Sequence, residues 1–294
     1  MKNKALFSVL AAGTFWGTMG FFARSLYATG FGPLEVAQTR ITTGLLFVGL
    51  YILLFNRNLF RVKWKDIWCF LGTGIVSLLL FSTCYFSALN YTSLAVAAIL
   101  LYTAPFFVML LSLVLFKERM TGKKVFALLL AFAGCVLVSG IFTAGGTFTA
   151  GGLALGICAG FGYALYSIFS RYAIQRGYHP MTITFYTFLL SAVGGVFFTD
   201  FGQIATSSAE YGMALWLPML AYVVLGTVGA YLLYTAGLKH IDNSKASVMA
   251  AVEPACATLL QIVVLRVLPD AYTMVGIVLV LGAIVWLNVE PKKK

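Results

Sequence analysis

Charged residues are scarce in this sequence. Of its 294 residues only 10% are charged, nine are acidic and two are histidine, whereas 61% are hydrophobic. A soluble domain cannot cover its surface with so few charges, so the composition indicates an integral membrane protein. The apolar segment from Ala5 to Phe22 is followed by further apolar runs and by no soluble domain. We therefore expect a first membrane span there and not a cleaved signal peptide.

Enzyme motifs are missing as well. The sequence contains no HExxH, GxSxG, P-loop or Rossmann glycine pattern, so we expect no catalytic residue, no cofactor and no ATP-driven pump. The five cysteines form no CxxC pair and are expected to be small buried side chains, neither disulfides nor metal ligands. No metal site is expected, and the two histidines, His179 and His240, are assigned no role.

The net charge of +11 raises the question of nucleic-acid binding, and the placement of the charges answers it. All but three of the 20 Lys and Arg residues fall at the chain ends or in every second loop between apolar runs. Membrane orientation produces this alternation, with the basic loops facing the cytoplasm. We expect no nucleic-acid partner, and we expect a multi-pass protein of the cell (inner or plasma) membrane with both termini in the cytoplasm.

Apolar windows of about 20 residues, the length that crosses a bilayer, predict ten spans. They cover residues 5–22, 34–55, 67–89, 94–116, 124–142, 151–174, 181–199, 213–238, 244–268 and 271–289. The outer segments 143–152 and 200–212 are rich in Gly, Thr, Ser and acidic residues and are expected to be connectors with no fold of their own. The predicted fold class is an all-α membrane protein.

The two halves of the chain resemble each other. Shifts of 149 or 147 positions superpose matching residues: Pro105 with Pro254, Tyr85 with Tyr234, Arg24 with Arg171, and Trp16 with Tyr163. The halves, residues 1–143 and 149–294, then hold five spans each. Because five is odd, the second half enters the membrane from the opposite side, which predicts two inverted five-helix repeats. Such repeats suit alternating access, in which a central site opens to either side in turn.

Two spans carry a proline near mid-membrane. Pro105 and Pro254 each remove a backbone donor and are expected to break their helix about one turn earlier. Glu253 directly precedes the second proline, and a carboxyl group inside the bilayer is a functional-site candidate because it is costly there. Three interpretations of Glu253 are open: it binds an ammonium group, it carries a coupling proton, or it pairs permanently with Arg40.

Arg40 lies six residues into the second predicted span. Its guanidinium group either holds a substrate carboxylate with two hydrogen bonds or has a structural or gating role. The second interpretation is favoured because the membrane boundary is close. Gln38 is grouped with it as a gating or structural residue that hydrogen-bonds either Arg40 or a ligand.

Aromatic residues recur on the spans expected to line a cavity. Pairs spaced three or four apart share a helix face, and a tyrosine at membrane depth needs a hydroxyl partner that a wet cavity supplies. The predicted substrate-binding residues are Trp16, Phe81, Tyr85, Tyr102, Tyr163, Tyr166, Tyr231, Tyr234 and Glu253. An aromatic cavity with one acid favours planar or cationic ligands. It also suits a zwitterion if Arg40 or a helix N-terminus takes the carboxylate.

Several short motifs together resemble one transporter family. They are Thr14-Phe15-Trp16-Gly17, Arg40, the run from Tyr102 to Leu113 with Phe116-Lys117-Glu118 after it, and Glu253-Pro254. Over both halves the chain is similar to the EamA type of the drug/metabolite transporter superfamily. The resemblance implies ten helices around a cavity lined by spans 1, 3, 4, 6, 8 and 9, with spans 5 and 10 at the periphery. The chain departs from the family pattern at Val267, which stands where Glu118 stands in the first half.

These features predict a secondary active transporter that moves a small metabolite, such as an amino acid, by alternating access, with a proton as the candidate coupling ion. The resemblance implies export, and the residues themselves give no direction. The alternative is an organic-cation or multidrug efflux carrier. A membrane-embedded enzyme is disfavoured because no span carries paired carboxylates or a His/Asp set. The expected partners are the substrate and the lipid bilayer; a monomer is sufficient, and a dimer stays an open alternative.

Overall fold

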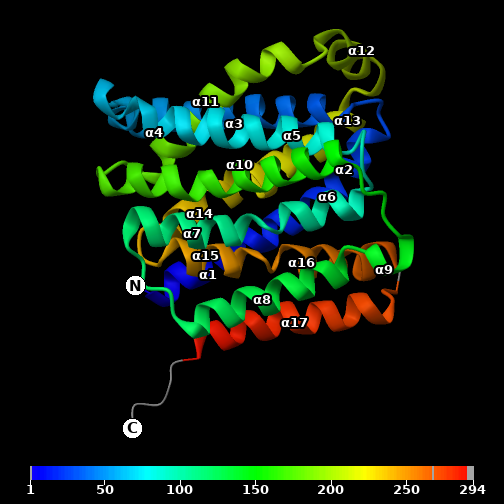
Figure 1. Ribbon diagram of the computed structural model, residues 1–294. Helices are drawn as coiled ribbons and strands as arrows, with labels where there is room; N and C mark the ends of the chain where they lie inside the picture. Colours follow the sequence, from blue (N-terminus) through cyan, green and yellow to red (C-terminus); the bar gives the residue numbers. More distant parts are fainter. Residues whose placement is uncertain (1, 267, 290–294) are drawn as a thin grey trace.

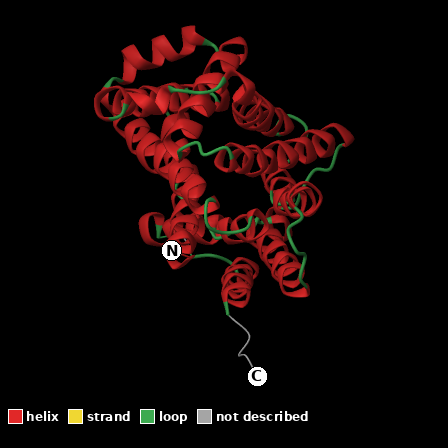
Figure 2. Cartoon of the chain, turned by 90° about the vertical axis from the view of Figure 1, so that its left-hand side faces the viewer, coloured by secondary structure: helices red, strands yellow, loops and turns green. Residues whose placement is uncertain are grey.

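The computed structural model describes residues 2–266 and 268–289. Over these residues the chain is helix and loop with no strand, as Figure 2 shows in a view on to the end at which the chain begins. The predicted all-α fold is confirmed. α1 begins and α17 ends at the same end of the bundle (Figure 1), as an even number of spans requires. We call this the terminus end and the opposite one the far end.

The first half contains five helical rods. They are α1 (Lys2–Gly17) with α2 (Met19–Tyr27); α3 (Pro33–Phe55); α4 (Ile67–Leu71), η3 (Gly72–Leu79) and α5 (Leu80–Ala88); α6 (Leu94–Leu101) with α7 (Ala104–Phe116); and α8 (Gly122–Val138). Three short helices connect or follow these rods: η1 (Arg57–Phe60), η2 (Trp64–Asp66) and α9 (Ile141–Ala144).

The second half contains five more rods. They are α10 (Ala150–Gln175); α11 (Pro180–Gly195) with η4 (Val196–Phe198); α13 (Met213–Tyr222), η5 (Val223–Gly229) and α14 (Ala230–Leu238); α15 (Asn243–Ala250), α16 (Glu253–Leu260) and η6 (Gln261–Leu265); and α17 (Ala271–Asn288). A separate helix, α12 (Phe201–Tyr211), lies between the second and third of them.

The ten predicted spans are confirmed. Within the described residues, nine rods are long and apolar enough to cross a membrane. The tenth, α8, has 17 residues and a length of about 25 Å at 1.5 Å per residue. It packs along α17 at the edge of the bundle (Figure 1), where a methyl group added to Gly134 or Gly276 would lie 2.7 Å from the other glycine's carbonyl oxygen.

The connector predicted over residues 200–212 is wrong, because most of it is the helix α12. Asp200 caps this helix by accepting a hydrogen bond from the Gln203 N–H at 3.1 Å. The Gln203 side chain donates to the Gly30 carbonyl oxygen, and Glu35 accepts from the Asp200 N–H at 3.1 Å. α12 therefore ties the second half to the loop after the first rod at the far end.

The inverted repeat is visible in the local backbone. The third rod of each half contains a π-helical segment, η3 or η5, and the 149-residue shift makes the two overlap. The fourth rod of each half ends at a basic residue with a left-handed backbone, Lys117 and Arg266, both with φ 54°. Residues other than glycine seldom adopt a positive φ, so this match supports two copies of one fold.

Both proline-containing rods are broken, as predicted. The first break separates α6 from α7 just before Pro105, and the second separates α15 from α16 just before Pro254. At the first break the chain forms a tighter bond from the Thr103 N–H to the Leu100 carbonyl oxygen, at 3.2 Å. The missing proline donor explains both breaks, since the carbonyl group four residues earlier has no helical partner.

A glycine of the opposite half packs against each break. A methyl group added to Gly160 of α10 would lie 2.7 Å from the Leu100 carbonyl oxygen, next to the first break. One added to Gly13 of α1 would lie 3.0 Å from the Ala250 carbonyl oxygen, at the second break. The 147-residue shift superposes these two glycines. Each half therefore covers the broken helix of the other at a distance that only glycine permits.

Candidate functional site

A cavity of about 1150 Å³ lies between the two halves. Its wall includes residues of the two short joins at the far end, among them Ser93, Leu94, Pro269 and Asp270, so the cavity opens there. Its deepest part reaches Trp16 and the second helix break. The volume is slightly above the range typical for small-molecule sites.

Most of the predicted binding residues line this cavity. They are Trp16, Phe81, Tyr85, Tyr102, Tyr163, Tyr231 and Glu253, together with Arg40 and Pro254 from the other predicted groups. Aromatic side chains thus form one part of the wall, together with the acid Glu253 and the base Arg40. Other polar and charged side chains, such as Ser139 and Gln261, also line the cavity, and the role of each residue in binding stays a prediction.

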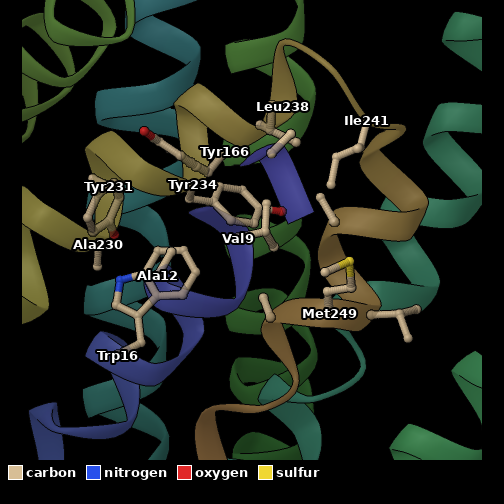
Figure 3. Packing of buried hydrophobic residues seen from close by; sticks show 14 of the residues in the cluster. Val9, Ala12, Trp16, Tyr166, Ala230, Tyr231, Tyr234, Leu238, Ile241 and Met249 are labelled. Carbon is tan, nitrogen blue, oxygen red and sulfur yellow. The ribbon is translucent and has the colours of Figure 1, made fainter. Parts of the chain in front are cut away.

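An aromatic cluster closes the cavity towards the terminus end. Trp16, which is 6% exposed, has its ring centroid 6.0 Å from that of Tyr163, 5.6 Å from Tyr231 and 5.2 Å from Tyr234. Tyr166 lies behind, 5.0 Å from Tyr231. Figure 3 shows Trp16 of α1 facing Tyr231 and Tyr234 of α14. We call these five residues the aromatic floor.

Tyr166 and Tyr234 were predicted to line the cavity, and they lie beneath it instead. The Tyr166 hydroxyl shares a hydrogen bond of 2.8 Å with Thr235, and the Tyr234 hydroxyl shares one of 2.8 Å with Ser167. With Trp16 they surround a separate space of only about 10 Å³. Their hydroxyl groups are satisfied by protein partners and not by a wet cavity.

We expect Tyr234→Phe to lower stability and to leave ligand affinity unchanged. The substitution removes the partner of the Ser167 hydroxyl in a buried site, which costs about 1–3 kcal/mol. The matched variant is Tyr231→Phe, which removes the same atom from the cavity wall. Thermal unfolding gives the first effect and a Kd measurement gives the second. An equal change of Kd in both variants would show that Tyr234 belongs to the binding surface.

Gln38 also lies away from the cavity. Its side-chain amide donates to the Ala192 carbonyl oxygen at 3.0 Å and to the Thr42 hydroxyl at 3.3 Å, and the residue is 7% exposed. These bonds tie α3 to α11. The predicted hydrogen bond from Gln38 to Arg40 or to a ligand is therefore replaced by a structural contact between the halves.

Glu253 is the first residue of α16 and is only partly buried. Its side chain lines both the main cavity and a second cavity of about 30 Å³ that contains Pro105. Gly17 lets α1 approach this point, since a methyl group there would lie 2.7 Å from the Glu253 carbonyl oxygen. None of the ion pairs among the described residues includes Glu253.

Arg40 reaches the same cavity from α3. Its Nη1 atom lies 3.5 Å from the Thr227 hydroxyl, and its guanidinium carbon lies 5.7 Å from the centroid of the Tyr222 ring. It forms no ion pair with Glu253 in the part of the chain described, so the permanent pair considered from the sequence is wrong. The acid and the base are therefore separate groups on one wall.

Tyr222 is a cavity residue that sequence reasoning missed. It precedes Tyr231 by nine residues, which at 3.6 residues per turn places the two on opposite helix faces. The π-helical segment η5 lies between them and changes this offset, because each of its turns holds additional residues. Both tyrosines therefore line the cavity. Paired glycines at Gly226 and Gly229 are the available signal for an irregular helix here.

Hydrogen bonds to one carboxylate close the terminus end. Glu118 accepts from the Asn243 N–H at 2.8 Å, from the Ser244 N–H at 3.2 Å and from the Ser244 hydroxyl at 2.6 Å, and so caps α15. Arg171 Nη2 lies 4.0 Å from Glu118 Oε1, and Arg171 also donates to the Leu238 carbonyl oxygen. We call Glu118, Arg171, Asn243 and Ser244 the terminus-end latch.

Comparison with known proteins agrees with this architecture. The family model described as the EamA-like transporter family matches residues 3–140 and 150–289. This chain belongs to the EamA-like transporter family. The family that its motifs resembled is confirmed, and the two matches fall on the two halves that the backbone repeats.

Relatives of this EamA-like protein are transporters too. It is 28% identical over 253 residues to an uncharacterized transporter of Archaeoglobus fulgidus, with 86% of this chain and 84% of that protein covered. It is 24% identical over 284 residues to the uncharacterized transporter YxxF of Bacillus subtilis, with 95% and 88% covered. A crystal structure that is 21% identical matches with a TM-score of 0.79 over 98% and 97% of the two chains, which supports the fold. The protein is a multi-pass membrane transporter.

Proposed function

We propose that this EamA-like transporter is a secondary active exporter of a small amino-acid-like metabolite in the cell membrane. One observation carries the proposal: a cavity between the two inverted halves is lined by residues of the far-end joins and by Trp16 of the aromatic floor, with Glu253 and Arg40 on its wall. Two similar halves can exchange conformations, and the cavity then opens to the other side. The substrate crosses the membrane in that exchange.

The charges on the wall favour a zwitterion. The Arg40 guanidinium group presents a planar fork that matches a carboxylate, and Glu253 accepts from an ammonium group. Neither is neutralised by the other, as the absence of a Glu253–Arg40 ion pair among the described residues shows. A substrate with both charges satisfies both groups, whereas a singly charged substrate displaces water from one of them without replacing it by a partner.

Glu253 is also our candidate proton carrier. Partly buried carboxyl groups inside membrane proteins commonly serve as proton relays, and this one has no cation partner in an ion pair of the described chain. A proton that binds Glu253 when the substrate leaves would couple the two movements. Uphill export would then be driven by the proton gradient.

The placement of the basic residues supports termini in the cytoplasm. Lys117, Arg119, Arg171 and Lys239 gather around a groove at the terminus end, and cytoplasmic loops carry the excess of Lys and Arg in membrane proteins. The far end is then outside the cell, so the conformation described is open to the outside. A single chain supplies both halves of the cavity.

A second function, organic-cation efflux, is favoured by the aromatic wall. Six of the predicted aromatic residues line the cavity together with Glu253, and aromatic faces attract planar cations. In this alternative Glu253 is the counter-ion of the substrate. Arg40 opposes the alternative, because its positive charge lies on the same wall.

A thermal-shift screen separates these two functions. The purified protein is tested with amino acids, polyamines and planar organic cations, alongside Glu253→Gln and Arg40→Gln. We expect zwitterionic amino acids to raise the Tm of the wild type, and we expect Arg40→Gln to remove this shift. Stabilisation by cations alone, lost in Glu253→Gln and kept in Arg40→Gln, would replace the proposed function with cation efflux.

A further inference from the structure

Each end of the bundle carries an arginine at an equivalent position of the repeat, and within the described residues only the arginine at the terminus end has an acidic partner. At the terminus end Arg171 lies against Glu118, within the latch that caps α15. The 147-residue shift superposes Arg24 on Arg171, and the 149-residue shift superposes Val267 on Glu118. The far end therefore keeps the arginine of the latch and lacks its acid at the corresponding position.

A different acid stands close to the missing one. Asp270 follows three residues after Val267, at the join between η6 and α17, and it caps α17 by accepting from the Thr273 N–H at 2.8 Å. Both Arg24 and Asp270 are exposed and line the mouth of the main cavity. Among the described residues Arg24 forms no ion pair. Position 267 itself lies outside the described residues.

We infer that Arg24 and Asp270 form the gate that closes the far end. This inference rests on the proposed alternating access: when the cavity opens at the terminus end, the far-end joins approach each other and the Arg24 guanidinium binds the Asp270 carboxylate. The pair takes the place that Arg171 and Glu118 have at the terminus end. Asp270 provides the carboxylate that the repeat would place at position 267, where the chain has valine. Arg24 is the repeat counterpart of Arg171 and provides the guanidinium group.

The geometry explains why only one gate is closed at a time. In an inverted repeat the two halves exchange their conformations when the transporter changes state. The contacts that close the terminus end in one state therefore have equivalents that close the far end in the other state. Arg171 is engaged and Arg24 is free to solvent in the state described. Because each ion pair stabilises one state only, weakening either pair shifts the population towards the opposite state.

The experiment measures the exposure of a cysteine in the cavity from each end. Ala257→Cys, on the cavity wall, is placed in a full-length chain whose five native cysteines are replaced. A membrane-impermeant methanethiosulfonate reagent is added to vesicles of either orientation. Glu118→Gln weakens charge-assisted hydrogen bonds, so we expect far-end labelling to slow about tenfold and terminus-end labelling to appear.

The gate itself is tested in the Glu118→Gln background. Asp270→Asn keeps the helix cap, since asparagine caps as well as aspartate, and removes the charge. We expect it to restore fast far-end labelling, and we expect the exchange of both charges, Arg24→Asp with Asp270→Arg, to slow labelling again. Asp200→Asn is the matched control, because Asp200 caps α12 at the same end and does not line the cavity.

The outcomes separate this gate from the proposed function. If Glu118→Gln shifts labelling between the ends and Asp270→Asn has no more effect than Asp200→Asn, the Arg24–Asp270 gate is wrong and alternating access stands. If Glu118→Gln and wild type label alike, with no terminus-end labelling from either, both the gate and alternating access between these ends are overturned.

Discussion

Glu253→Gln is expected to abolish substrate accumulation driven by a pH gradient and to leave substrate exchange intact. Glutamine keeps the size of the side chain and can accept hydrogen bonds, but it never binds or releases a proton near neutral pH. With one proton per substrate, a gradient of one pH unit supports a concentration ratio of about 10. We expect this ratio in proteoliposomes of the wild type and a ratio of about 1 in the variant.

Glu210→Gln serves as the control for this experiment. Glu210 is an exposed acid of α12 that does not line the cavity, so its loss should leave accumulation unchanged. The ligand found in the thermal-shift screen is the transported probe. Tenfold accumulation that persists in Glu253→Gln would exclude Glu253 as the proton carrier and leave it as a substrate-binding group.

Gly160→Ala is expected to lower the stability of the protein markedly. The added carbon would lie 2.7 Å from both the Leu100 carbonyl oxygen and the Thr103 hydroxyl oxygen. The threonine can rotate, but the carbonyl group belongs to the backbone, so α10 must move away from the first break. Overpacking of this kind costs about 1–3 kcal/mol, and the Tm should fall by several degrees.

Gly282→Ala is the matched control, because no atom lies within 4 Å of the position that its methyl group would take. Alanine has a higher helix propensity than glycine, so this variant should be neutral or slightly more stable. Gly13→Ala, at the second break, should resemble Gly160→Ala. If Gly160→Ala and Gly282→Ala unfold at the same temperature, the close packing of α10 on the break contributes nothing to stability.

The spans could be predicted from the sequence because the bilayer imposes their length and composition. Residues 213–238 were predicted as one span and are covered by α13, η5 and α14 without a gap. The helix α12 was missed because its length of 11 residues is too short for a span and polar residues are mixed with apolar ones along it. Its cap at Asp200 was the available signal, since aspartate is a preferred N-cap residue.

The binding residues were predicted less completely. Helical spacing shows which residues share a helix face, but it does not show how deep each residue lies along the cavity. Tyr163 and Tyr166 share a face of α10, as do Tyr231 and Tyr234 on α14. Three residues, however, separate each pair by about 4.5 Å along the axis. This is enough to place one member of each pair on the cavity wall and the other beneath the cavity, where it bonds a neighbouring hydroxyl group.

Contacts between the halves were beyond sequence reasoning for another reason. The bond from Gln38 to the Ala192 carbonyl oxygen joins residues 154 positions apart, and no local pattern identifies its partner. The separation of Glu253 from Arg40 depends on how the two halves dock. The inverted repeat constrains which helices meet, yet the rotation of each helix is set by packing that the sequence pattern leaves open.

The crossed contacts of Gly13 and Gly160 bear on how the chain is assembled during synthesis. The break in α6 and α7 is covered by α10, which the ribosome makes later. After five helices have been inserted, the broken backbone beside Pro105 still lacks its covering helix, and irregular backbone that faces lipid is costly. The first half is therefore not a completed folding unit. During synthesis it should be held by insertion factors until α10 has been made, and a fragment that ends after α8 should be degraded.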